Sequence, residues 1–204
     1  MRMTLSISAA LVALWLAYAV SPFVGVYRLV GTIEERDVAA LAARVDFRAV
    51  RGSLAEQIAR TYLRITGKAG APNSLRDQLA LQLAIGVATS VADQILADLA
   101  SPQGLLDFLR TGGPPEVEPD GLPTPGGLSR QALGNVWRAY LNSELGIARF
   151  FLDVPVDKPR QESFRFQFCL RDWTWKLCGI ELPEAMQVRL AQELVKREAS
   201  RPRG

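Results

Sequence analysis

Two cysteines, Cys169 and Cys178, are the residues whose side-chain chemistry the sequence indicates most directly. They lie on two adjacent predicted strands, and in a hairpin centred on Trp173-Thr174 they are directly opposite each other. In an oxidising compartment such a pair can form a cross-strand disulfide. A shift of the register would place them diagonally and leave two half-buried free thiols, so both states stay open at this point. Their spacing is not a metal motif.

Histidine chemistry is excluded, because the chain contains no histidine. This removes Ser-His-Asp triads, histidine general bases and histidine-rich zinc sites. Gly67-Lys68 is not a phosphate loop, since residue 62 is Tyr and residue 69 is Ala where such a loop needs a glycine and a hydroxyl. The sequence therefore predicts no catalytic residue, no metal and no cofactor, and we expect the protein not to be an enzyme.

Carboxylates are the remaining candidates for acid–base chemistry. Glu34, Glu35 and Asp37 are close in sequence, but no partner base is nearby, and a solvated helix end is the expected role. Asp93 interrupts an apolar helix and is the best single candidate for an acid with a shifted pKa. A hydrogen-bonded or surface position is the simpler expectation for it.

An aromatic strand face is predicted from Phe164, Phe166, Phe168, Trp173 and Trp175, which alternate along two strands. We expect this face to be core beneath the helices. A sharper hypothesis is that Phe166, Phe168, Trp173 and Trp175 line a concave apolar pocket.

The overall composition limits the class of protein. The 204 residues are 49% hydrophobic and 22% charged, which excludes wholesale disorder. Only one stretch is long and uncharged enough to cross a bilayer, so a multi-span protein is excluded. The net charge of +3 is too small to indicate a nucleic-acid partner.

The N-terminal segment over residues 3–27 contains no charged residue, and residues 9–20 are an unbroken apolar run. A signal peptide would be cleaved after a small-x-small site, and residues 17–19 (Ala-Tyr-Ala) fit one. An uncleaved anchor would use residues 5–26, which are long enough to span the hydrocarbon. We favour the anchor, because the apolar character continues past the cleavage candidate. A buried core helix of a cytosolic protein is the least favoured alternative.

The orientation of this segment follows from charge. Arg2 precedes the apolar run, whereas the arginines after it are offset by Glu34, Glu35 and Asp37. The positive end is expected to stay in the cytoplasm. We therefore predict a single-pass inner-membrane protein with its soluble domain in the periplasm, or a periplasmic protein released by cleavage near Ala19.

The rest of the chain predicts helices followed by a small sheet. Ser21-Pro22 would begin a new helix, Asp37 would cap a short helix, and Ser53 with Glu56 would form a capping box. Further helices are predicted over residues 74–100, as the most buried one, and after Ser101-Pro102. Strands are predicted over residues 148–156, 163–170 and 173–182, and residues 136–141 are left undecided between strand and helix. A last helix begins at Pro183.

This order predicts an α+β fold in which a helical layer packs on a small C-terminal antiparallel sheet. We expect residues 1–27 to be the signal anchor or signal peptide and residues 28–204 to be one domain. The Gly/Pro-rich residues 112–127 are predicted to be a flexible loop within that domain.

Three segments resemble a known family: residues 21–54, 101–109 and 173–183. Together they are similar to the proteobacterial family called domain of unknown function twenty-nine thirty-nine. The resemblance covers most of residues 21–183 and rests on the order of the segments. It implies an N-terminal membrane segment and no known activity. The layout is also similar to the cone-shaped cystatin-like and nuclear-transport-factor-like sheets, an analogy that cannot carry function.

Asp46, Phe47 and Arg51 form the densest part of this family resemblance. They are read as structural: Asp46 caps a turn and pairs with an arginine, while Phe47 enters the core. A polar ligand contact is the alternative. The expected function is a membrane-tethered, non-enzymatic interaction or scaffold domain of the cell envelope. Its partners would be the membrane and an unknown envelope protein or lipid, and the alternative function is binding an apolar small molecule between sheet and helix.

Overall fold

The computed structural model describes residues 2–67, 78, 79, 82, 101–111, 143–155 and 158–199. The helices in these ranges are α1 (Arg2–Glu34), α2 (Val38–Arg44), α3 (Phe47–Ile65), α6 (Pro102–Thr111), the short 3₁₀ helix η1 (Arg160–Glu162) and α8 (Glu184–Ala199). The strands β1 (Glu144–Leu145), β2 (Arg149–Val154), β3 (Phe164–Arg171) and β4 (Thr174–Glu181) form an antiparallel sheet in the order β1-β2-β3-β4. The α+β prediction is confirmed.

Several predictions concern parts of the chain outside these ranges. They are the helix over residues 74–100 with Asp93, the loop over 112–127 and the undecided segment 136–141. Gln78, Leu79 and Gln82 are the described residues of the first of these, and all three are helical.

One face of the sheet forms the core. Its side chains are at most 6% exposed: Phe150, Leu152 and Val154 from β2, Phe164, Phe166 and Phe168 from β3, and Trp175, Leu177 and Ile180 from β4. The alternation predicted for β2 and β3 is confirmed. Helix α1 covers this face through Phe23, whose ring meets Phe150 edge-on at 4.9 Å, and α6 does so through Phe108 on Phe164.

Helix α1 is continuous through Pro22, so the prediction of a new helix at Ser21-Pro22 is wrong. Proline has no N–H, which leaves the carbonyl of Tyr18 without its usual helical donor. The Ser21 hydroxyl donates to that carbonyl at 2.7 Å. A side chain thus replaces the missing backbone bond, as also happens in membrane helices that contain proline.

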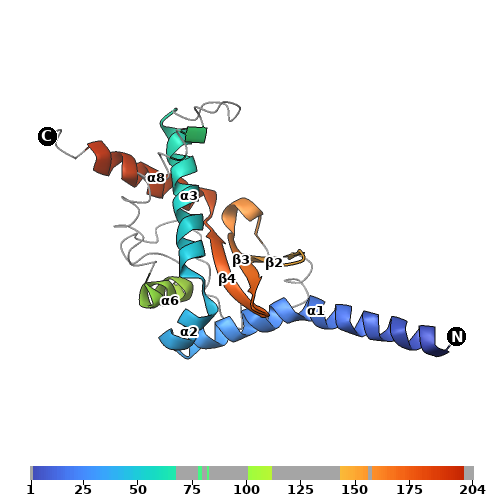
Figure 1. The fold of residues 1–204 in the computed structure, drawn as a ribbon. Coiled ribbons are helices and arrows are strands. Elements are labelled where there is room, and N and C mark those ends of the chain that lie inside the picture. Colours follow the sequence, from blue (N-terminus) through green and yellow to red (C-terminus); the bar gives the residue numbers. More distant parts are fainter. Residues whose placement is uncertain are drawn as a thin grey trace.

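The two halves of α1 have different surroundings (Figure 1). The side chains of residues 6–17 are exposed, and this half extends away from the rest of the protein. From Ala19 onward the helix contributes buried core residues, among them Val26, Leu29, Val30 and Ile33. The segment Ser6–Glu34 is long and apolar enough to cross a membrane.

The starts of α2 and α3 depend on aspartate caps. Asp37 accepts from the Ala40 N–H at 2.9 Å, as predicted. Asp46 accepts from the Ala49 N–H at 3.1 Å and begins α3. The predicted capping box at Ser53 is therefore wrong, because the helix is already formed there. Asp46, seven residues before Ser53, is the residue that caps the start of this helix.

The turn between β3 and β4 consists of Asp172 and Trp173, which both have positive φ angles of 47° and 60°. The predicted centre at Trp173-Thr174 is wrong by one residue. Consequently Trp173 does not share the core face: it is 96% exposed. A β-bulge between Gln167 and Phe168 changes the register further along the hairpin.

Candidate functional site

A disulfide joins Cys169 on β3 to Cys178 on β4, with Cα atoms 5.8 Å apart. The two residues are not a directly opposed pair, because Cys169 is opposite Lys176. The bulge leaves Cys178 unpaired in the ladder. The bond ties the two strands together and leaves neither sulfur as a thiol nucleophile or metal ligand.

The four aromatic residues predicted to line a pocket separate into two pairs. Phe166 and Phe168 are each 1% exposed and are packed within the core. Trp173 and Trp175 instead form part of the wall of a groove of about 500 Å³ between α1 and the β3–β4 hairpin. The structure thus brings Trp173 and Trp175 together in one groove. The helix that forms its other wall is α1, which the sequence does not predict for this site.

The groove beside α1 has mostly apolar walls. On α1 it is lined by residues that recur along one stripe: Leu14, Ala17, Tyr18, Val20, Ser21, Val24, Gly25 and Arg28. Arg28 and Arg44 are its charged lining residues. The Nε atom of Arg44 is itself buried and has no hydrogen bond.

Close packing fixes α1 against β4 at this groove. A Cβ atom on Gly25 would be 2.7 Å from the Cβ of Trp175, so only glycine permits this approach. The Trp175 indole Nε1 donates to the Ser21 hydroxyl at 2.9 Å. On the other side, the Tyr18 hydroxyl donates to the carbonyl of Ile147 in the β1–β2 turn.

The contacts of Asp46, Phe47 and Arg51 are those of a structural motif. The Asp46 carboxylate caps α3, and its backbone N–H donates to the Leu177 carbonyl of β4 at 2.8 Å. Phe47 is partly buried against the core, and Arg51 is half-buried one turn along α3. The motif therefore connects α3 to the sheet.

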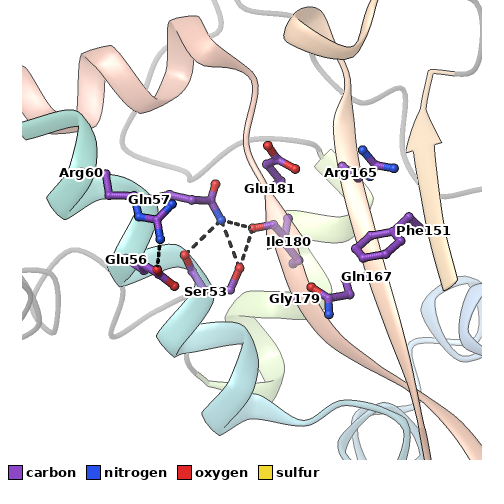
Figure 2. Close-up of a pocket in the computed structure, with 10 residues that line it drawn as sticks. All are labelled: Ser53, Glu56, Gln57, Arg60, Phe151, Arg165, Gln167, Gly179, Ile180 and Glu181. Atoms are coloured by element: carbon purple, nitrogen blue, oxygen red, sulfur yellow. Dashed lines mark hydrogen bonds and ion pairs between the residues drawn. The ribbon is translucent and has the colours of Figure 1, made fainter. Parts of the chain in front are cut away.

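A second pocket, of about 320 Å³, lies where α3 meets the outer face of the sheet (Figure 2). Several of its polar groups on α3 already have partners. Gln57 donates from Nε2 to the Ile180 carbonyl at 2.6 Å and accepts from the Leu182 N–H at 2.9 Å. Arg60 forms an ion pair with Glu56, so the positive and negative charges on this side of the pocket offset each other.

Arg165 is the most buried charged residue described, at 5% exposed, and the sequence reasoning missed it. Its Nη2 is 2.8 Å from Glu144, its Nε is 3.6 Å from the Asp153 Oδ1, and its guanidinium is over the Phe151 ring at 4.7 Å. Arg165 lowers the pKa of Glu144, whereas burial raises the pKa of Asp153. Alternation with Phe164 and Phe166 places Arg165 on the opposite face of β3, where an exposed side chain is expected, so the period alone does not predict its burial.

Three of the candidate carboxylates lie within the described part of the chain. Glu34, Glu35 and Asp37 are exposed at the end of α1, as predicted. Among the residues that the structure describes, no group of histidine, cysteine, aspartate or glutamate side chains is arranged to hold a metal ion.

One comparison with known proteins finds a family. Residues 11–108 match the model of the family described as "Protein of unknown function (DUF2939)", which confirms the predicted resemblance over that part of the chain. The match includes most of α1 together with α2, α3 and most of α6, and ends before the sheet. The third resembling segment, residues 173–183, lies outside it. Neither the search of curated proteins nor that of solved structures found a significant match.

Proposed function

We propose that this protein is a single-pass, membrane-tethered domain of the cell envelope with a non-enzymatic interaction or scaffold role. The observation that carries the proposal is the division of α1, whose exposed apolar half continues without a break into the core. An exposed apolar helix half is stable in lipid and unfavourable in water.

The periplasmic orientation is supported by two independent features. Arg2 precedes the apolar run, and Glu34, Glu35 and Asp37 offset the arginines that follow it, which we take to favour a cytoplasmic N-terminus. The Cys169–Cys178 disulfide is typical of an oxidising compartment.

Retention of the anchor is favoured over cleavage near Ala19. Ala19 is 4% exposed in the folded protein, so cleavage beside it would remove a residue that is packed in the core. Cleavage there would also remove Tyr18, which binds the β1–β2 turn.

A reporter fusion tests the orientation and the anchor together. A reporter enzyme that is active only after export is fused to the C-terminus, and the membrane fraction is washed at high pH. We expect an active reporter, retention in the washed membrane and an intact N-terminus by mass. An inactive reporter would overturn the orientation, and a soluble product beginning near Val20 would overturn the anchor.

The interaction role is supported by the polar pocket of Figure 2, because the α3 side chains Glu56, Gln57 and Arg60 that line it already have partners. Such a surface suits recognition of another polar surface better than acid–base catalysis. Photocrosslinking from Gln167 in intact cells, with Gln192 on α8 as the control position, tests this role. A discrete protein adduct at Gln167 alone is expected, and identical patterns at both positions would contradict it.

The second candidate function is binding of a lipid in the groove between α1 and the hairpin. Its apolar walls and its two lining arginines, Arg28 and Arg44, favour an anionic amphiphile. Native mass spectrometry of the full chain, released from native membranes, would show a bound lipid. Loss of that lipid in Arg44→Gln would support the site, and its retention would exclude it.

A further inference from the structure

We propose that the two turns beside Tyr18 insert the side chains of Ile147 and Trp173 into the interfacial layer of the bilayer. We call these two residues the membrane collar. The inference deepens the proposed function, because it rests on α1 spanning the membrane. It assigns a lipid-contacting surface to the folded domain itself.

The collar residues are the most exposed large apolar side chains described. Ile147 is 92% exposed and Trp173 is 96% exposed, each at the tip of a turn of the sheet. Turns facing water usually carry Gly, Pro, Asn, Asp or Ser. Trp173 also adopts a positive φ, which is unusual for a bulky residue. Both tips lie at the same end of the sheet, because the β1–β2 and β3–β4 turns of this antiparallel sheet are on one side.

Both collar turns contact α1 at the place where its exposed half ends. The Tyr18 hydroxyl donates to the Ile147 carbonyl, and Trp173 lines the same groove as Tyr18 and Ala17. Figure 1 shows the tips of the sheet beside the middle of α1, where the free half begins. The two collar residues therefore lie near the point at which the exposed half of α1 leaves the domain.

The length of the free helix brings this point to the membrane surface. From Arg2, the charge that bounds the apolar run, to Tyr18 there are 16 residues, or about 24 Å of helix. The hydrocarbon core is roughly 30 Å thick. The free half is too short by itself, so the apolar layer must extend to the first turn of α1 that contacts the domain. Ile147 and Trp173 are then at the level of the interface.

The residue types of the collar suit an interface. Tryptophan and tyrosine are enriched at the headgroup level, where one edge of the ring is apolar and the other is wet. An exposed arginine is two residues from each tip, Arg149 beside Ile147 and Arg171 beside Trp173, and both can reach lipid phosphates. Asp172 is the acidic neighbour in the second turn. A protein partner on the collar is less favoured, because it would have to compete with the adjoining bilayer.

Depth measurements on the full chain in lipid vesicles test the collar. Single cysteines are introduced as Ile147→Cys and Trp173→Cys and labelled with an environment-sensitive fluorophore. Gln161→Cys, on exposed η1 at the other end of the sheet, is the matched control. Leu11→Cys reports independently on α1. Vesicles carry lipids with a nitroxide at a shallow or a deep acyl position, and retention of the native disulfide is checked by mass.

The expected result is blue-shifted emission at positions 147 and 173, with several-fold stronger quenching by shallow nitroxide lipids than at position 161. Position 11 should be quenched best by the deep nitroxide. Deep quenching at 11 with no lipid quenching at 147 and 173 would overturn the collar and leave the anchor standing. No quenching at position 11 would overturn the anchor itself. Protection of 147 and 173 from both lipid and aqueous quenchers would mean that protein covers the tips, and would also overturn the collar.

Discussion

The hydroxyl of Ser21 connects the indole of Trp175 to the proline-interrupted turn of α1. It accepts from the Trp175 Nε1 at 2.9 Å and donates to the Tyr18 carbonyl at 2.7 Å. One side chain therefore satisfies a buried donor on the sheet and an acceptor that Pro22 leaves without its helical N–H.

The first prediction concerns this hydroxyl. Ser21→Ala should lower the free energy of unfolding by about 1–3 kcal/mol, because Trp175 loses its acceptor in a buried position. The measurement is unfolding of the full chain in detergent, followed by circular dichroism. In a Trp175→Phe background the same change should cost less, since no indole donor remains. Equal costs in both backgrounds would contradict the assigned bond, and Ser21→Thr should retain most of the stability.

The second prediction uses two helical glycines with opposite surroundings. Gly25→Ala should destabilise by about 1–3 kcal/mol, because the new Cβ would be 2.7 Å from the Cβ of Trp175. Gly52→Ala should stabilise by about 0.5–1 kcal/mol, because nothing lies within 4 Å and alanine favours the helix. Unfolding in denaturant measures both, and a shared sign would refute the close contact of α1 with β4.

The third prediction concerns the start of α3. Asp46→Ala should cost about 0.5–2 kcal/mol, because the Ala49 N–H loses its cap. Asp46→Asn retains a capping oxygen and should be close to neutral. A ligand-binding role would instead leave the stability unchanged in both variants, so thermal unfolding of the pair separates the two roles.

The fourth prediction concerns the disulfide. Its removal by Cys169→Ser with Cys178→Ser should lower stability by roughly 2–3 kcal/mol, as expected for a closed loop of about ten residues. Protein made with its export segment should show no free thiol on alkylation after unfolding. Full alkylation of protein from intact envelopes would contradict both the bond and the proposed compartment.

The fifth prediction concerns pH. Burial raises the pKa of Asp153 above its ordinary value of 3.8, so the folded state binds this proton more tightly than the unfolded state. This group's contribution to stability therefore falls as pH rises from about 4 through the folded pKa. Glu144 has a lowered pKa and acts in the opposite direction. The stability of Asp153→Asn relative to the unmodified chain should increase between pH 4 and pH 7, and a decrease would show that pairing with Arg165 outweighs burial.

The parts of the fold that depend on period and caps were predictable from the sequence. Phe164, Phe166 and Phe168 alternate with polar residues, and one buried face follows from that period. Asp37 precedes an apolar helical pattern and caps it. Both signals are local, so they needed no knowledge of tertiary contacts.

The site could be predicted only in part, because its geometry depends on distant contacts. The Asp172-Trp173 turn has two positive φ angles without a glycine, so the usual turn signature is missing and the register shifted by one residue. That shift moved Trp173 from the core face to a turn tip. The sequence alone predicts a helix start at Pro22. Proline is tolerated inside α1 because the Ser21 hydroxyl, which is bonded to Trp175 on β4, replaces the missing donor.

The unbroken passage of α1 through Pro22 has a mechanical consequence. A domain on a flexible tether sweeps a volume around its attachment point and captures partners within that radius. In the proposed membrane-anchored state, α1 connects rigidly to the domain, so a tilt or rotation of the helix in the lipid turns the sheet by the same angle. Encounter with a partner is then governed by two-dimensional diffusion of the whole molecule. The distance from the membrane surface at which a partner is met is fixed by the dimensions of the domain.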